Sequence, residues 1–203
     1  MINIIRILIA ATCCLLLVTS VNAKEINQNA KASVSNSVKD KLDKKHKIIT
    51  FIKLVQPKYS TALANRITEA LFKSSVKYNV DPMVVVATAY VESEFSMHAK
   101  PCIGIMQLVT PSIRFFDPKK TMNPYVLEHN IDLGVKEISY HLKRTTRRGS
   151  SPDHSSMSRA LQRYNGSKYK ISYAIKVLLV KNRLIKYSID SLKKKLKTSP
   201  LWR

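Results

Sequence analysis

The chain is poor in glycine and proline, the residues that punctuate tight turns. Glycine accounts for 4 of its 203 residues and proline for 8. So few turn-forming residues argue against a loop-rich β architecture. Long stretches instead repeat apolar residues at helical spacing, and 45% apolar residues are enough to fill a core. The composition therefore predicts one all-α domain of ordinary size with terminal extensions.

Acidic residues are also scarce. The chain has 13 Asp and Glu against 35 Lys and Arg, which gives a formal net charge of +22 at pH 7. A charge of this size says little about the fold but indicates an anionic partner. Nucleic acid is one alternative, but the sequence has neither a glycine-rich phosphate-binding loop nor an aromatic ladder for stacking bases. We therefore expect no nucleic-acid partner, a view that the export signal described next supports.

The N-terminus has the pattern of a cleavable export signal. Arg6 precedes an apolar run over 7–18, and the residues at Val21 and Ala23 suit cleavage after Ala23. The run is too short to span a bilayer comfortably, although an uncleaved membrane anchor stays an alternative. The sequence thus predicts a signal peptide over 1–23 and a protein of the periplasm or cell envelope.

Cysteine is scarce, and two of the three cysteines, Cys13 and Cys14, lie within the predicted signal. They raise a lipoprotein alternative, which the short apolar run before them fits poorly. After cleavage one cysteine, Cys102, would be left, and one thiol cannot form an internal disulfide. The fold must then be stable through its core alone. A single cysteine is more often a small buried hydrophobe than a reactive thiol.

The histidines do not form a metal-binding pattern. His98 and Cys102 are four residues apart, but Pro101 disrupts a helix between them. We therefore predict no metal and no cofactor. The other histidines that we considered are scattered without ligand spacing: His129, His141 and His154.

Two charged segments flank the predicted globular part. Residues 24–47 are polar and lysine-rich, without an apolar period long enough to bury a face, and are predicted to be a disordered basic linker. The globular domain is expected over 48–185, followed by a basic C-terminal tail over 186–203. Apolar residues are mixed with lysines over 176–203. This end is therefore either core packing followed by a solvated tail or an amphipathic segment that lies on anionic envelope surfaces.

Two helices can be placed from their caps. Ser60 or Thr61 can cap a helix that ends near Lys77 and carries apolar residues on one face. In the following dipeptide, Asp81-Pro82, the aspartate can cap the next helix and the proline takes its favoured first position. This second helix, over 83–95, is apolar nearly all round and is predicted to be buried.

One acidic residue, Glu92, lies near the end of the apolar helix. Burial disfavours the charged form of a carboxyl group, so Glu92 is expected to keep its proton near neutral pH, as a general acid must. A structural ion pair with a lysine or arginine is the plainer alternative. The neighbouring Glu94 lies about 200° away around the helix, at ~100° per residue, and is predicted to be a solvated surface charge.

Glu92 belongs to an ordered set of short motifs. In chain order they are Tyr78-Asn79-Val80-Asp81-Pro82, Glu92-Ser93-Glu94-Phe95, Gly104-Ile105-Met106-Gln107, Asn130-Ile131 with Gly134, Ala160 with Tyr164-Asn165, and Tyr173 with Val177. Each motif alone is weak, but the ordered set resembles the catalytic domain of the soluble lytic transglycosylases, lysozyme-like enzymes that cleave the glycan strands of peptidoglycan. The resemblance covers roughly residues 60 to 180. It implies an all-α, lysozyme-like fold with a substrate groove.

The resemblance also implies roles for individual residues. Glu92 matches the family's single catalytic acid/base, and Tyr164 matches the tyrosine whose hydroxyl contacts that glutamate. Met106 and Gln107 match residues that line the sugar subsites, and Asn165 helps to shape the same groove. The expected substrate-binding residues are Ser93, Met106, Gln107, Tyr164, Asn165 and Tyr173.

The reaction implied by the resemblance is non-hydrolytic. The acid protonates the glycosidic oxygen between N-acetylmuramic acid and N-acetylglucosamine, and the muramic 6-hydroxyl then closes onto the anomeric carbon to leave a 1,6-anhydro end. Ordinary glycoside hydrolysis instead uses two carboxylates, about 5 to 9.5 Å apart. Asp117 and Asp132 could serve as a second acid, but one belongs to a predicted turn and the other to a helix face. The scarcity of acids favours the one-acid reaction.

Two departures from the family pattern keep alternatives open. The segment over 96–103 is shorter than the family's loop and lacks its substrate-contacting serine, and Gly166 follows Asn165 directly where the family usually has an intervening alanine. One alternative is a basic peptidoglycan-binding protein with weak or no catalysis, and another is a muramidase that hydrolyses the bond. Small family members often serve secretion machines, so the expected partners are peptidoglycan and a component of such a machine.

Overall fold

The structure, a computed structural model, describes residues 38–147, 150–166 and 170–198. The predicted signal peptide over 1–23 lies outside the described residues. By its contacts the chain divides into two units, Met1–Lys44 and Lys45–Arg203.

The second unit is built of helices. In chain order they are α2 (Thr61–Tyr78), α3 (Pro82–Ser93), α4 (Thr110–Phe116), α5 (Leu127–Thr145), α6 (His154–Asn165), α7 (Lys170–Lys186) and α8 (Ile189–Thr198). Across the described ranges, β pairing is limited to an isolated bridge between Ile103 and Leu108. The prediction of an all-α fold is therefore confirmed.

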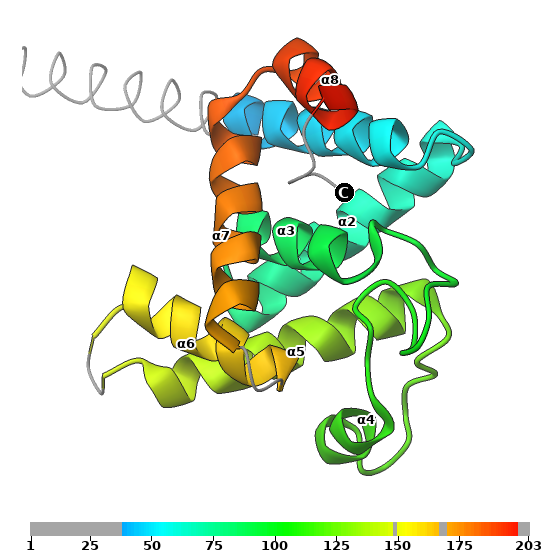
Figure 1. Ribbon diagram of the computed structural model, residues 1–203. Helices are drawn as coiled ribbons and strands as arrows, with labels where there is room; N and C mark the ends of the chain where they lie inside the picture. The colour runs from blue at the N-terminus through cyan, green and yellow to red at the C-terminus, as the bar shows by residue number, and fades with distance from the viewer. Residues whose placement is uncertain (1–37, 148–149, 167–169, 199–203) are drawn as a thin grey trace, which may run out of the picture. The chain divides into compact units, whose positions relative to one another are not determined.

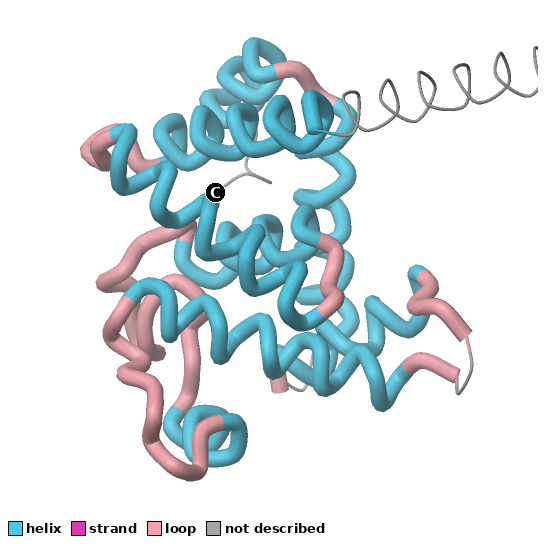
Figure 2. Tube along the Cα trace, turned by 180° about the vertical axis from the view of Figure 1, so that it is seen from behind, coloured by secondary structure: helices cyan, strands magenta, loops and turns pink. Residues whose placement is uncertain are grey.

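Helix α3 occupies the centre of the packing (Figure 1). It packs against α2 and α7, while α5 packs against α2, α4 and α6, and α6 packs against α7. The two longest loops flank the short helix α4, as the view from behind shows (Figure 2).

The predicted caps start both helices as expected. The Ser60 side chain accepts a hydrogen bond from the Leu63 N–H at 3.1 Å, and the Asp81 side chain accepts one from the Met83 N–H at 2.8 Å. Pro82 takes the first position of α3, where its missing N–H costs no hydrogen bond. The local sequence therefore sets where α2 and α3 begin.

The prediction that α3 is buried is also confirmed. Every residue from Met83 to Tyr90 is buried, and Val84 to Ala87 have no exposed surface. A helix with apolar residues all round can be covered only by neighbours on every side, which α2 and α7 help to provide.

Two segments that we expected to lie outside the folded domain contain helix. Residues 38–47, part of the predicted linker over 24–47, are helical within a helix over 38–55. Lysine is a good helix former, and an ion pair between Lys44 and Asp40, one turn apart, adds local support. Polar composition alone was therefore a poor guide to disorder here.

The predicted tail over 186–203 contains α8, which begins after Ser188. The Ser188 hydroxyl accepts a hydrogen bond from the Ser191 N–H at 3.3 Å, as a helix cap does. Leu192 is fully buried, and Leu196, one turn later, packs against the same core. Two leucines at helical spacing are enough to dock this lysine-rich segment.

Across the described ranges, no helix combines the length and apolarity that crossing a membrane requires.

Candidate active site

Glu92 lies in the last turn of α3, where the buried helix reaches the surface. It is half-buried, whereas Glu94 is exposed, as predicted. The pKa of Glu92 is raised from its ordinary value of 4.5 to about 7; burial is the largest cause, and the negative charge of Glu137 acts in the same direction. A hydrogen bond from Tyr173 and the positive charge of Lys176 lower the pKa. Burial outweighs these two, so the carboxyl group holds its proton up to neutral pH.

The hydroxyl group that contacts Glu92 belongs to Tyr173, on α7. It donates a hydrogen bond to Oε1 of Glu92. We expected Tyr164 to make this contact, and that expectation was wrong: the Tyr164 hydroxyl donates to the Met106 carbonyl at 2.7 Å. The packing of α7 on α3 brings Tyr173 to the acid. Burial and the charge of Glu92 raise the pKa of Tyr173 well above its ordinary value, so it remains a donor.

The backbone that follows Glu92 adopts a strained conformation. Glu94 and Phe95 have φ values of 52° and 63°, a region that bulky residues rarely adopt. Gln56 donates to the Glu94 carbonyl at 2.9 Å and Tyr59 donates to the Phe95 carbonyl at 3.1 Å. The buried Phe95 ring also packs among core aromatics. These contacts end α3 sharply and fix the direction of its last turn.

The glycine-led turn lies against this end of α3. Ile103 and Leu108 exchange backbone hydrogen bonds of 2.9 and 3.0 Å, which closes the turn. Gly104 has φ 68°, and a Cβ there would lie 2.6 Å from Cγ of Asn130, so glycine is required twice over. The Ser93 hydroxyl donates to the Ile105 carbonyl at 2.8 Å, which joins the turn to the residue beside Glu92.

Two further helices hold the same turn by one residue, Met106. Its N–H donates to Oδ1 of Asn130 on α5 at 2.9 Å, and its carbonyl accepts from Tyr164 on α6. Its side chain is fully buried, so it supports the turn from within and does not line a subsite as we expected. A Cβ added to Gly134 would lie 2.7 Å from Cβ of Met106, so α5 approaches the turn as closely as glycine allows.

The side chain of Gln107 braces its own loop. Its Nε2 donates to the carbonyls of Ala99 and Gly104 at 3.1 and 2.9 Å, and its Oε1 accepts from the Cys102 N–H at 3.2 Å. These bonds shape the shortened segment between α3 and the turn. Asn165, the last residue of α6, is half-buried, and Gly166 ends the helix with φ 67°.

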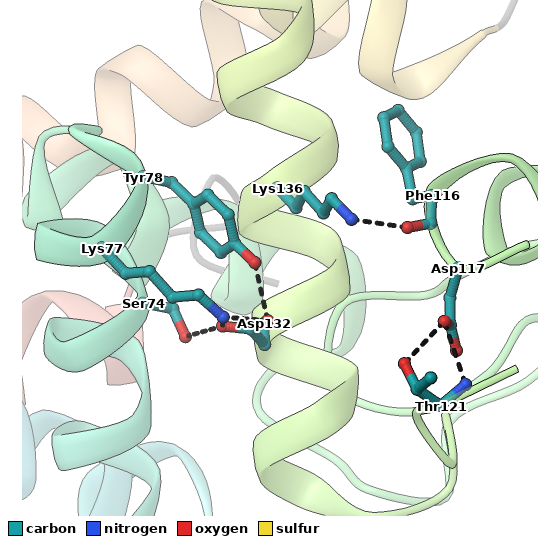
Figure 3. A network of polar contacts seen from close by, with 8 residues as sticks. All are labelled: Ser74, Lys77, Tyr78, Phe116, Asp117, Thr121, Asp132 and Lys136. Carbon is teal, nitrogen blue, oxygen red and sulfur yellow. Dashed lines mark hydrogen bonds and ion pairs between the residues drawn. The ribbon is translucent and has the colours of Figure 1, made fainter. Parts of the chain in front are cut away.

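The two aspartates that we considered as second acids are engaged elsewhere (Figure 3). Asp132 accepts hydrogen bonds from Lys77 and Tyr78, each at 2.8 Å. Asp117 accepts from the backbone N–H groups of Thr121 and Met122 at 3.0 and 2.7 Å, and these bonds lower its pKa. Both serve the local structure of α2, α5 and the loop after α4.

The acidic residue that raises the pKa of Glu92 is Glu137, which the sequence analysis missed. It is 7% exposed, and its Oε1 accepts a hydrogen bond from the Ser112 hydroxyl at 2.8 Å. A usable signal was present in the sequence: Glu137 follows Asn130 and Gly134 at helical spacing, so the three share one face of α5.

In the described part of the chain, no three His, Cys, Asp or Glu residues are grouped so as to hold a metal ion. The arrangement around Glu92 is that of one carboxyl group with a tuned proton affinity beside a rigid turn.

Comparison with known proteins agrees with this geometry. Neither the curated proteins nor the solved structures include a significant match to the chain. The transglycosylase SLT domain family matches residues 69–177, which contain α3, the glycine-led turn, α5, α6 and the Tyr173 position. Proteins of this family act on peptidoglycan, outside the cytoplasm, as lytic transglycosylases. The match spans more than half of the sequence, and the chain belongs to the transglycosylase SLT domain family.

Proposed function

We propose that the protein is a lytic transglycosylase that cleaves the β-1,4 bond between N-acetylmuramic acid and N-acetylglucosamine, with Glu92 as its acid/base. The observation that carries the proposal is the half-buried carboxyl group with a pKa of about 7, in the family's motif. Near neutral pH both of its protonation states are populated, so one group can give a proton and later take one back.

The proposed reaction has two proton transfers. Glu92 donates its proton to the glycosidic oxygen while the bond between this oxygen and the anomeric carbon breaks. The oxygen of the muramic 6-hydroxyl then bonds to the anomeric carbon, and its proton passes to the Glu92 carboxylate. The products are a free 4-hydroxyl and a 1,6-anhydro end, and no water is consumed.

Tyr173 and the turn support these steps. The hydroxyl of Tyr173 stabilises the Glu92 carboxylate between the two proton transfers, because it donates to the charged form. The turn is fixed by Ser93, Asn130 and Tyr164, from three helices, so the surface beside the acid is rigid before substrate binds.

The products of digestion test the proposal. Purified peptidoglycan sacculi are incubated with the chain or with Glu92→Gln, and the soluble products are analysed by mass spectrometry. We expect anhydro-muropeptides from the wild type and none from the variant. Glu94→Gln, which removes an exposed acid two residues away, is the matched control and should retain activity.

Other outcomes would favour the alternatives. Products that carry an added water would assign the protein as a muramidase, which hydrolyses the same bond. Sacculi that bind both proteins and release nothing would favour a basic wall-binding protein, for which the net charge of +22 is the supporting observation.

We also propose that the protein is exported through residues 1–23 and works at an anionic envelope surface. Support comes from α7, where Ile171, Ile175 and Leu179 are exposed one turn apart and Lys176 lies exposed among them. Cosedimentation of the chain with anionic and neutral vesicles tests this. We expect the chain to bind anionic vesicles and salt to abolish this binding; equal binding to neutral vesicles contradicts the proposal.

A secretion-machine partner is a further proposal, which rests on the family alone.

A further inference from the structure

Glu137 is a buried acid to which the proposed reaction gives no role. It lies on α5, is 7% exposed, and has no Lys or Arg ion pair within the described residues. Burying an unpaired carboxylate is costly, so a folded chain rarely keeps one without a use. The surroundings of Glu137 indicate what that use is.

Helix α5 presents one face to the active site. Asn130 and Gly134, on this face, contact the glycine-led turn through Met106. Glu137 follows Gly134 by three residues and therefore lies one turn further along the same face. The negative charge of Glu137 also raises the pKa of Tyr164 and that of Tyr173, whose hydroxyl donates a hydrogen bond to Glu92. Glu137 is thus a member of the cluster around Glu92.

The Glu137 carboxylate is held in place from a different helix. The hydroxyl of Ser112, on α4, donates to its Oε1 at 2.8 Å. His141, one turn later on α5, places Nε2 at 3.8 Å from the same oxygen, which is too far for a hydrogen bond. Nδ1 of His141 is buried without a hydrogen-bond partner in the described structure.

We propose that Glu137 is a positioning residue of the active site, whose buried negative charge keeps the proton on Glu92. The proposal rests on the proposed role of Glu92 as the acid. The charged and titratable groups that face the pair are Tyr173 and Lys176 on α7, Tyr164 on α6 and His141 on α5. Within this cluster, Glu137 raises the pKa of Glu92. Glu94, two residues from Glu92 in the sequence, is exposed to solvent.

A like charge near a carboxyl group favours its neutral form, because ionisation would place two negative charges close together. In this way Glu137 lets a half-buried acid remain a proton donor although Tyr173 and Lys176 both stabilise its charged form. A merely structural acid on α5 would not change the titration of Glu92.

The test is the titration of Glu92 in Glu137→Gln. The glutamine keeps the shape and can still accept from Ser112, but it has no charge. The carboxyl ¹³C signal of Glu92, identified by its absence in Glu92→Gln, is followed against pH by NMR. We expect its midpoint to move to lower pH in Glu137→Gln. The midpoint should return toward the wild-type value in Glu137→Asp, which restores the charge, and stay unchanged in Glu94→Gln.

An unchanged midpoint in Glu137→Gln would overturn the proposal, as would an equal shift in Glu94→Gln. If Glu137→Gln does not fold, Ser112→Ala takes its place, because it keeps the charge but releases the carboxylate from its position. A shift to lower pH is expected there too, and no shift contradicts the proposal.

Activity provides a second readout. The rate of release from sacculi near pH 7 should fall about twofold to tenfold in Glu137→Gln, and less at lower pH, because one unit of pKa changes the protonated-to-ionised ratio tenfold. If the wild type releases no products although Glu92 titrates as expected, the proposed transglycosylase activity is wrong. The titration would still support the positioning role of Glu137. Suppose that the wild type releases hydrolysed products, which carry an added water, and that Glu137→Gln releases none. Glu137 would then be a catalytic base, and the positioning role would be wrong.

Discussion

The Tyr173 hydroxyl on α7 donates a hydrogen bond to Oε1 of Glu92 on α3. This bond favours the charged form of the carboxyl group, whereas burial favours the neutral form. The opposition between them, adjusted by Glu137 and Lys176, leaves the pKa of Glu92 at about 7. A shift in either direction would cost the enzyme one of the two protonation states that the proposed reaction uses.

Removal of the Tyr173 hydroxyl should therefore raise the pKa of Glu92 above about 7. In Tyr173→Phe the carboxylate loses its donor, so the proton is held more tightly. The pH at which activity falls, as the acid ionises, should move to higher pH, and the second proton transfer should slow. A pH–rate profile on sacculi measures both effects, with Tyr125→Phe, at an exposed position, as the control. A shift to lower pH would contradict this account of the site.

Glu92→Gln should stabilise the folded protein at neutral pH. The folded-state pKa of Glu92 is raised from 4.5 to about 7, so the folded chain binds this proton more tightly than the unfolded chain. The contribution of Glu92 to stability is therefore greatest below about pH 4.5 and falls as the pH rises toward 7, where the buried group ionises. Glutamine avoids that loss, and we expect a gain of about 1–3 kcal/mol in the free energy of unfolding.

Urea denaturation of both proteins across this pH range measures the gain. The two curves should converge at the acid end, where Glu92 is protonated in either state. A variant that is less stable than the wild type at every pH would show that the carboxylate makes structural bonds that outweigh its burial.

Asp132→Asn should lower stability without changing the chemistry. The aspartate binds Lys77 and Tyr78 and so joins α2 to α5 (Figure 3). Because Lys77 is half-exposed, we expect a loss of only about 0.5–1 kcal/mol. The pH–rate profile should match that of the wild type. An activity loss as large as that of Glu92→Gln would restore Asp132 as a second acid.

Local signals predicted the part of the fold next to the site. Ser60 and the Asp81-Pro82 pair fixed the starts of α2 and α3, and the apolar run of α3 predicted a buried helix with an ionisable group near its end. The raised pKa of Glu92 followed from burial alone and was confirmed. These features depend on residues close together in the sequence, which a single chain reveals.

The partners of Glu92 could not be predicted in the same way. Tyr164 and Tyr173 are both half-buried tyrosines that follow the turn, and the packing of α6 and α7 decides which hydroxyl meets the acid. Glu137 was overlooked because it stands between polar and apolar residues with no motif of its own. Its importance follows only once Asn130 and Gly134 are seen to place that face of α5 against the turn.

The contact between α5 and the turn makes Gly134 a sensitive position. In Gly134→Ala the new Cβ would lie 2.7 Å from Cβ of Met106, closer than real contacts allow. Alanine gains about 1 kcal/mol of helix propensity over glycine, but overpacking a well-filled core costs about 1–3 kcal/mol. Because Asn130 and Tyr164 anchor Met106 by its backbone, relief of the clash must move the turn or α5. We therefore expect a lower melting temperature together with a fall in activity.

Gly166→Ala is the control variant, because it introduces backbone strain without a steric clash. Gly166 has φ 67°, which disfavours alanine by about 1–2 kcal/mol, yet a Cβ there would meet no atom within 4 Å. Thermal unfolding and release of products from sacculi, measured for both variants, distinguish the two causes. Strain at Gly166 should lower the melting temperature modestly, whereas the clash at Gly134 should also displace the surface beside Glu92. If Gly134→Ala were as stable and as active as the wild type, α5 would not be pressing on the turn, and the rigid support that we assign to Met106 would be wrong.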